Sequence, residues 1–103
     1  MTYELLLEPE VHEARKKLPG KVRQQIRRAI DALATEPRPA HSKPLNLEGL
    51  DVPAAVEVHR LQLDRWRIVY AVNEDEKWVW VLAVRQRPPY NYEDLEALLK
   101  NLE

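Results

Sequence analysis

The chain has 103 residues, with 16 lysines and arginines, 17 aspartates and glutamates, three histidines and no cysteine. The lack of cysteine excludes disulfide bonds, thiolate metal sites and a cysteine nucleophile, and two glycines are too few for a glycine-rich phosphate loop. We expect one domain, residues 1–103, whose stability rests on packing alone.

The charges are unevenly distributed, although the formal net charge is only −1. Between Arg15 and Arg28 there are seven basic residues and no acidic residue, whereas residues 91–103 carry four acids and one lysine. The near-neutral total is therefore the sum of opposed regions. A second basic set lies in the β-rich part of the chain and consists of Arg60, Arg65, Arg67, Arg85 and Arg87.

The N-terminal third of the chain predicts a strand followed by two helices. Residues 3–7 form a short β-favouring run, and Pro9 suits the first turn of a helix that extends to Leu18. A Leu-Pro-Gly sequence ends this helix. A second helix is expected over residues 21–35, where apolar residues recur at three- and four-residue spacing and the basic residues lie outside the apolar stripe.

The rest of the chain predicts a connector, three strands and a final helix. Residues 36–53 hold four of the eight prolines, so we expect a stiff connector that is either functional or pinned to the core by its leucines. The β-rich runs 55–63, 66–73 and 78–84 predict an antiparallel meander. Simple alternation places Trp78, Trp80, Leu82 and Val84 on one face, which we expect to cover the helices.

The last helix is expected to be capped by Asn91 and to carry a thin leucine stripe, which predicts that it is weakly held. The order β-α-α-β-β-β-α is typical of the α+β class. No metal site is predicted, because His12, His41 and His59 lack ligand-like spacing. His59 has the opposite strand parity to Arg60 and is expected to face away from the strand arginines.

A longer pattern extends over residues 57–92. It comprises a strand with basic residues, a tight turn, the strand Trp66-Arg67-Ile68-Val69-Tyr70, an apolar strand ending in Arg85-Gln86-Arg87, and Tyr90 and Tyr92 before the last helix. This pattern resembles the RelE/ParE toxin superfamily, in particular its RelE-like branch. The resemblance implies a small antiparallel β-sheet with the two N-terminal helices packed on one side and a mobile C-terminal helix.

The same resemblance implies the toxin of a type II toxin–antitoxin system, a ribosome-dependent mRNA endoribonuclease that inhibits translation. Arg67 takes the place of the arginine that stabilises the scissile phosphate, Arg60 that of a basic residue on the preceding strand, and Arg87 that of the arginine after the last strand. Tyr92 and Tyr90 compete for the place of the tyrosine that acts on the reacting nucleotide. The implied partners are a cognate antitoxin protein and a ribosome with bound mRNA.

RNA cleavage without a metal ion requires that the 2′-hydroxyl attack the adjacent phosphate, with cations around the phosphorane and groups that accept and donate protons. Arginine suits the cationic role because its planar guanidinium binds phosphate oxygens in pairs and stays charged. A tyrosine either acts as a base, if arginines lower its pKa from about 10, or stacks on a nucleobase. No cofactor is expected.

Further basic residues are expected either to bind RNA or the ribosome or to be solvated charges: Arg65, Arg85, Lys21, Arg23, Arg27 and Arg28. For Arg67 the alternative is a strand-end arginine paired with Asp64 or Glu57. Apolar runs are far shorter than a membrane span, so we expect no membrane partner and a cytoplasmic location.

Two alternatives to the nuclease remain open at this stage. A ParE-like protein of the same fold would inhibit DNA gyrase and would perform no RNA chemistry. A catalytically inactive binding module is suggested by the near-neutral charge and by Gln62, which stands where many members of the superfamily carry a second basic residue.

Overall fold

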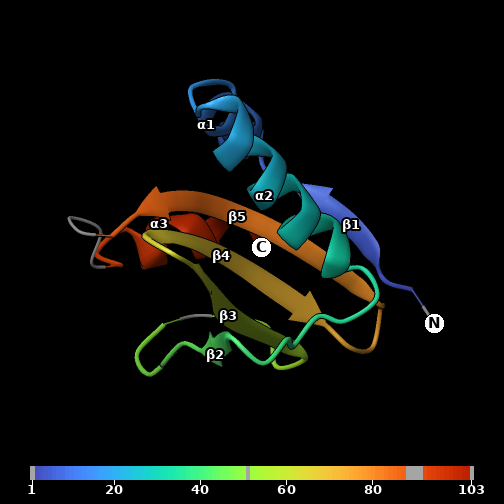
Figure 1. Cartoon of the computed structure of the whole chain (residues 1–103). Coiled ribbons are helices and arrows are strands. Elements are labelled where there is room, and N and C mark those ends of the chain that lie inside the picture. Colours follow the sequence, from blue (N-terminus) through green and yellow to red (C-terminus); the bar gives the residue numbers. More distant parts are fainter. Residues whose placement is uncertain (1, 51, 88–91, 103) are drawn as a thin grey trace.

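A five-stranded sheet separates two sets of helices in the computed structural model, which describes residues 2–50, 52–87 and 92–102 (Figure 1). The strands are β1 (Glu4–Leu7), β2 (Ser42–Pro44), β3 (Val56–Leu63), β4 (Trp66–Asn73) and β5 (Trp78–Gln86). The helices are α1 (Pro9–Lys16), α2 (Gly20–Ala32) and α3 (Leu95–Leu99), and a 3-10 turn, η1 (Lys100–Leu102), follows α3. The α+β class and the two N-terminal helices on one side of the sheet are confirmed.

The sheet has the strand order β1-β5-β4-β3-β2. Strands β3, β4 and β5 form the predicted antiparallel meander. The sheet is mixed rather than antiparallel throughout, because β1 pairs in parallel with β5. After β1 the two helices return the chain to the same edge of the sheet, where the amide of Tyr3 donates to the carbonyl oxygen of Ala34. The connector then crosses to the opposite edge and adds β2 antiparallel to β3 (Figure 1).

Helices α1 and α2 cover one face of the sheet. Their apolar stripes bury Val11, Ile26 and Ile30 against a cluster that includes Ile68 and Tyr70 of β4. All five of these residues are at most 1% exposed. The three- and four-residue spacing of the apolar positions in α2 explains this packing, because it directs them to the same side of the helix. The basic residues of α2 remain outside the core.

Helix α3 covers the other face and is part of a second core cluster. Leu95, Leu98 and Leu99 are between 3% and 8% exposed and pack with residues of β3, β4 and β5. Three of its leucines are thus buried, and the weak attachment expected for the last helix stays a prediction. The expected cap, Asn91, lies outside the described residues, and α3 begins after Asp94.

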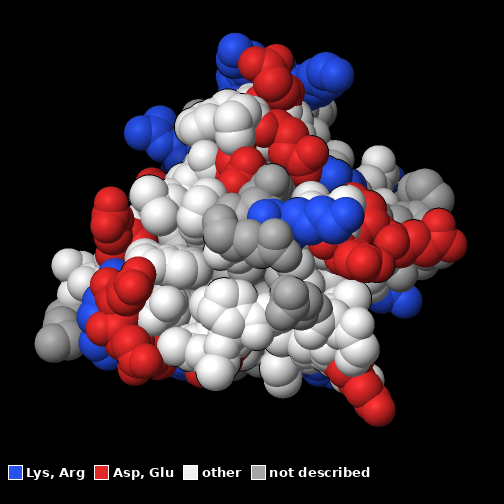
Figure 2. All heavy atoms as spheres, turned by 180° about the vertical axis from the view of Figure 1, so that it is seen from behind, with Lys and Arg blue, Asp and Glu red and all other residues white. Residues whose placement is uncertain are grey.

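Leucines of the connector pack partly against this second cluster, so the expectation that they pin the connector to the core is confirmed. The residues are Leu45, Leu47 and Leu50, with Val52 beside them. Figure 2 shows the molecule from this side, where residues other than lysine, arginine, aspartate and glutamate fill much of the centre and lower part. Charged residues are most frequent in the upper half and towards the left and right, and one basic side chain lies near the centre (Figure 2).

A β-bulge in β5 changes which side chains share a face. Tyr70 of β4 lies opposite Val81, but its neighbour Val69 lies opposite Ala83, so Leu82 is an extra residue in β5. Leu82 and Ala83 both pack in the cluster beneath α3, and Val84 packs on the side of α1 and α2. The expectation that Trp78, Trp80, Leu82 and Val84 share one face is therefore wrong for Val84, because alternation is interrupted at the bulge. Trp78 and Trp80 pack on the α3 side.

Candidate functional site

The strand arginines gather on the α3 side of the sheet. Arg67 of β4 lies directly between Gln62 of β3 and Arg85 of β5 in the register. Directly opposite residues point to the same face and have Cβ atoms about 5 Å apart. Arg87 follows Arg85 by two positions and has the same parity as Arg85. The structure thus brings Arg67, Arg85 and Arg87 together near the end of the sheet where β4 begins and β5 ends.

Arg60 of β3 belongs to the same face and lies two residues before Gln62, where it is opposite Val69. Its other cross-strand neighbour is Lys43 of β2. Lys43 is an exposed basic residue that sequence reasoning missed. No signal in the sequence could have assigned it, because β2 is a three-residue strand within a proline-rich segment. The structure therefore adds Lys43 to the basic row.

The Arg67 side chain is anchored by backbone carbonyls. Its Nη1 donates to the carbonyl oxygens of Asp64 at 2.8 Å and Trp66 at 3.0 Å. Its Nε is buried and has no hydrogen-bond acceptor within residues 2–50, 52–87 and 92–102. The expected alternative, an ion pair with the carboxylate of Asp64 or Glu57, does not form in this part of the chain. Because Nη1 alone makes the anchoring bonds, Nη2 remains as a donor for an anionic acceptor.

Arg85 is held between two carboxylates from distant parts of the chain. Its Nη2 lies 2.8 Å from Glu10 Oε1 of α1 and 3.1 Å from Asp94 Oδ2, immediately before α3. Burial disfavours the charged guanidinium, but Glu10 and Asp94 outweigh this effect, so the pKa of Arg85 is raised. Arg85 is therefore a cation positioned by α1 and by the start of the terminal helix.

Arg87 and Tyr92 form a cation–π contact. The guanidinium carbon of Arg87 lies 5.5 Å from the centroid of the Tyr92 ring. Tyr92 has a φ of 66°, in the left-handed region, and its hydroxyl oxygen is buried. Tyr90, the other candidate tyrosine, lies outside the described residues. Of the two, Tyr92 is thus placed beside one of the predicted arginines.

Arg65 lies in the turn between β3 and β4, next to Arg87. The amide of Arg87 donates to the carbonyl oxygen of Arg65 at 2.7 Å. Both residues line an open cleft of about 400 Å³ together with Asp64 and Gln86. Arg65 and Arg87 are exposed, so this cleft extends the arginine cluster towards solvent.

The basic residues of α2 do not join this cluster. Lys21, Arg23, Arg27 and Arg28 are exposed on a helix that packs against the opposite face of the sheet. The structure therefore separates the predicted basic residues into two groups. One group borders α3, and the other belongs to the pair of N-terminal helices.

His59 faces away from the strand arginines, as its strand parity predicts. It is 5% exposed, its ring stacks on Tyr70 with centroids 5.7 Å apart, and its Nε2 lies 2.9 Å from Glu57 Oε1. The Tyr70 hydroxyl donates to the carbonyl oxygen of Pro37 at 2.8 Å. These contacts give both residues a structural role in the core.

An ion-pair network lies beside His59 at one end of the sheet. Arg38 binds Glu57 at 2.8 Å and Glu74 at 2.7 Å. The hydrogen bonds from Arg38 and His59 lower the pKa of Glu57 to about 2. Those from Lys77, the Tyr3 hydroxyl and Arg38 lower the pKa of Glu74 to about 2. The network joins the connector to β3 and to the turn between β4 and β5.

The described residues hold neither a candidate metal site nor a candidate membrane-spanning helix. No three side chains of histidine, cysteine, aspartate or glutamate gather in a way that could hold a metal ion. No helix in the described part of the chain has the length and apolar character needed to cross a membrane.

Comparison with solved structures identifies the fold. The RelE of an archaeal RelE-RelB complex from Pyrococcus horikoshii OT3 superimposes with a TM-score of 0.74 at 24% identity, covering 87% of this chain and 100% of that one. The toxin-antitoxin complex RelBE2 from Mycobacterium tuberculosis gives 0.66 at 20% identity, with coverages of 84% and 100%. A mutant of the E. coli toxin RelE in the free state gives 0.64 at 20% identity, with coverages of 99% and 98%.

No protein-family model and no curated protein matches the sequence. The fold is therefore identified by structural similarity, since the sequences of these structures are only 20% to 24% identical to this chain. The likeness to the E. coli toxin covers 99% of this chain, so it extends over the sheet, the two N-terminal helices and the terminal helix. The chain has the fold of the RelE toxins.

Proposed function

We propose that the protein is a RelE-like toxin that cleaves mRNA on the ribosome without a metal ion. The observation that carries the proposal is the arrangement of Arg67 directly opposite Arg85, with Arg87 stacked on Tyr92 near the same end of the sheet. In the proposed reaction the 2′-hydroxyl of the RNA attacks the adjacent phosphorus, a phosphorane forms, and the bond to the 5′-oxygen of the next nucleotide breaks. The products are a 2′,3′-cyclic phosphate and a 5′-hydroxyl.

Arg67 is the residue proposed to bind the reacting phosphate. Its Nη1 is engaged by two carbonyl oxygens, which fixes the guanidinium before substrate arrives. Its Nη2 makes no hydrogen bond with the described residues and is the group left to donate to a non-bridging phosphate oxygen, whose charge grows as the phosphorane forms. Preorganised donors of this kind are worth roughly 10²–10³ in rate each. Arg60 and Lys43 extend the positive row along which the flanking phosphates would lie.

Arg87 and Tyr92 are proposed to act on the nucleotide beside the scissile bond. The cation–π contact keeps the tyrosine ring next to a positive charge. Two roles are open to the ring, proton transfer and stacking on a nucleobase, and stacking is worth roughly 1–3 kcal/mol. Tyr90 is retained as the alternative tyrosine.

A cognate antitoxin is proposed as the protein partner. Among the solved structures of similar fold, the archaeal RelE and the mycobacterial RelBE2 were both determined as complexes with an antitoxin. In this chain Asp94, at the start of α3, binds Arg85, and Tyr92 contacts Arg87. A partner that shifts α3 would therefore rearrange two arginines of the proposed site.

Primer extension on translating ribosomes tests the proposal. Wild-type protein is expected to give mRNA cuts that depend on ribosomes, and Arg67→Ala to cut at least about 10²-fold more slowly. Lys17→Ala is a matched control, because Lys17 is an exposed base on the other side of the molecule. Equal cutting by wild type and Arg67→Ala would overturn the proposed role. A DNA supercoiling assay with gyrase on the same samples tests the ParE-like alternative. That alternative requires the protein to inhibit gyrase when the two are present in equal amounts.

A further inference from the structure

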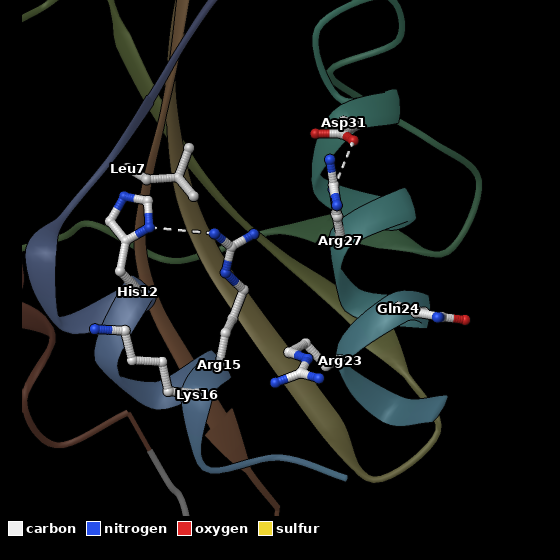
Figure 3. A pocket seen from close by; sticks show the side chains of 8 residues that line it. All are labelled: Leu7, His12, Arg15, Lys16, Arg23, Gln24, Arg27 and Asp31. Carbon is white, nitrogen blue, oxygen red and sulfur yellow. Dashed lines mark hydrogen bonds and ion pairs between the residues drawn. The ribbon is translucent and has the colours of Figure 1, made fainter. Parts of the chain in front are cut away.

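A second cationic feature lies outside the proposed catalytic site, in a cleft of about 580 Å³ between α1 and α2. Figure 3 shows the side chains that line it. Its charged lining comprises Arg15, Lys16, Arg23, Arg27 and Asp31, and Leu7 at the end of β1 is its apolar member.

Helical spacing explains why these side chains meet. On α1, His12, Arg15 and Lys16 are three and four residues apart and therefore occupy one side of the helix. On α2, Arg23 and Arg27 are separated by four residues, which aligns them along one side as well. A short turn joins the two helices, so the two stripes border the same cleft. Arg15 and Arg23 reach into the gap from opposite sides (Figure 3).

The charges in this cleft are poorly balanced. Asp31 is the one acidic residue in the lining. Its Oδ2 lies 3.9 Å from Arg27 Nε, so the two exposed side chains form only a long ion pair. Arg15 donates from Nη2 to His12 Nδ1 at 3.2 Å, which positions the guanidinium but does not neutralise it. Within the described residues neither Arg15 nor Arg23 forms an ion pair with a carboxylate. A cleft lined by one sign of charge attracts ligands of the opposite sign.

The lining favours phosphate groups over an acidic peptide. Three of its four cations are arginines, whose planar guanidinium matches phosphate oxygens in pairs. Leu7 is the one apolar side chain in the lining, so a peptide would bury little apolar surface there. A nucleic-acid backbone requires only positive charge for its affinity.

We infer that the cleft between α1 and α2 is a second RNA-binding site, which holds backbone phosphates and takes no part in cleavage. The choice of RNA rests on the proposed function. The inference adds His12 to the basic residues expected between Arg15 and Arg28, and it restricts the role of α2 chiefly to Arg23 and Arg27. Helix α1 borders both sites, since Glu10 in its first turn binds Arg85 and Lys16 lies about 9 Å further along its axis.

Fluorescence anisotropy with a labelled 2′-O-methyl RNA hairpin tests the inference, because this RNA binds but lacks the nucleophile for cleavage. The double variant Arg15→Gln/Arg23→Gln is expected to bind about tenfold or more weakly at 50 mM salt, and the slope of log Kd against log salt to fall by about 2. The matched control is Lys17→Gln/Lys21→Gln, which removes the same charge from two exposed residues outside the cleft lining, one directly after α1 and one in α2.

Several outcomes separate the possibilities. An equal loss of affinity in the two double variants would overturn the inference, because it would show a diffuse charge effect. So would displacement of the hairpin by poly-glutamate at the same concentration of charge. Arg15→Gln/Arg23→Gln is expected to leave the melting temperature unchanged or to raise it, because it removes repulsion between cations. A lower melting temperature together with lost binding would indicate a structural role instead. A failure of the cleavage proposal would appear in the ribosome assay of Arg67→Ala, whereas a failure of this inference would appear in the hairpin binding of Arg15→Gln/Arg23→Gln.

Discussion

Arg67 is held by backbone carbonyls, and this distinguishes it from Arg85, which is held by carboxylates. A carboxylate neutralises an arginine and competes with a phosphate for it, whereas a carbonyl orients the guanidinium and leaves its full positive charge. The sequence predicted only that both residues belong to the basic set of the β-rich part of the chain. Only the structure shows which groups hold each of them.

The first prediction concerns Arg67→Lys. A lysine keeps the positive charge but has neither the paired donors nor the planar shape that the two carbonyl contacts anchor. We expect cleavage to fall about 10²-fold on ribosomes, close to the effect of Arg67→Ala, with an unchanged melting temperature. Single-turnover primer extension measures the rate. Activity near that of wild type would show that charge alone suffices and would contradict the anchoring argument.

The second prediction concerns the acid stability of the network around Arg38. Glu57 and Glu74 have a pKa of about 2 in the folded protein, below the value near 4.3 of an unfolded chain. The stability they contribute is therefore present above about pH 4.3 and is lost as the pH falls towards 2. Arg38→Gln removes the main hydrogen-bond donor to Glu57, so the melting temperature of this variant should fall less steeply between pH 5 and pH 2 than that of wild type.

Thermal unfolding followed by circular dichroism at several pH values checks this behaviour. Arg28→Gln removes the same charge from an exposed position on α2 and is expected to keep the wild-type slope. Parallel curves for wild type and Arg38→Gln would show that the network does not couple the two carboxylates to folding.

At the scale of elements, the bulge in β5 determines which arginines can act together. Trp78 and Trp80 lie on the α3 side, and regular alternation from them would direct Arg85 to the side of α1 and α2. The extra residue Leu82 reverses the alternation, so Arg85 comes to lie beside Arg67. Alternation along a strand was predictable from the sequence. The bulge was not, because Leu82 and Ala83 are ordinary apolar residues and carry no turn or glycine signal.

The third prediction concerns the attachment of α3. Leu99 is 3% exposed in the core cluster on this side of the sheet, whereas Leu102 is half-buried. Leu99→Ala removes buried methyl groups and is expected to lower the free energy of unfolding by about 2–5 kcal/mol. The cost of Leu102→Ala should be clearly smaller. Urea unfolding measures both, and equal small losses would support the expectation of a weakly held terminal helix.

Prediction from the sequence succeeded for long elements and failed for short or irregular ones. The spacing of apolar residues in α2 and the β-rich runs of β3 and β4 are strong local signals, so these elements were predicted nearly to their bounds. The pairing of β1 with β5 depends on where the chain returns after two helices, and local signals do not encode it. The same reason hides Lys43, whose position beside Arg60 exists only through the register of β2.

At the scale of the whole molecule, charge is divided between two sides. The cleft between α1 and α2 is cationic, and the arginine cluster on the other side is partly neutralised by Glu10 and Asp94. Loss of residues 91–103 would remove four acids and one base, which changes the formal net charge from −1 to +2. The terminal segment therefore lowers the positive charge that an RNA meets at the proposed cleavage site.

The fourth prediction follows from this balance. A protein with a net charge of −1 attracts free RNA weakly, because affinity for RNA rests largely on neutralised phosphates. A ribosome supplies alignment of the mRNA, and so replaces the binding energy that the protein lacks. We expect the same mRNA to be cut at least about 10²-fold faster on translating ribosomes than free in solution, under conditions of equal protein and salt. Primer extension with and without ribosomes measures the ratio, and equal rates would show that the arginine cluster captures and cleaves RNA unaided.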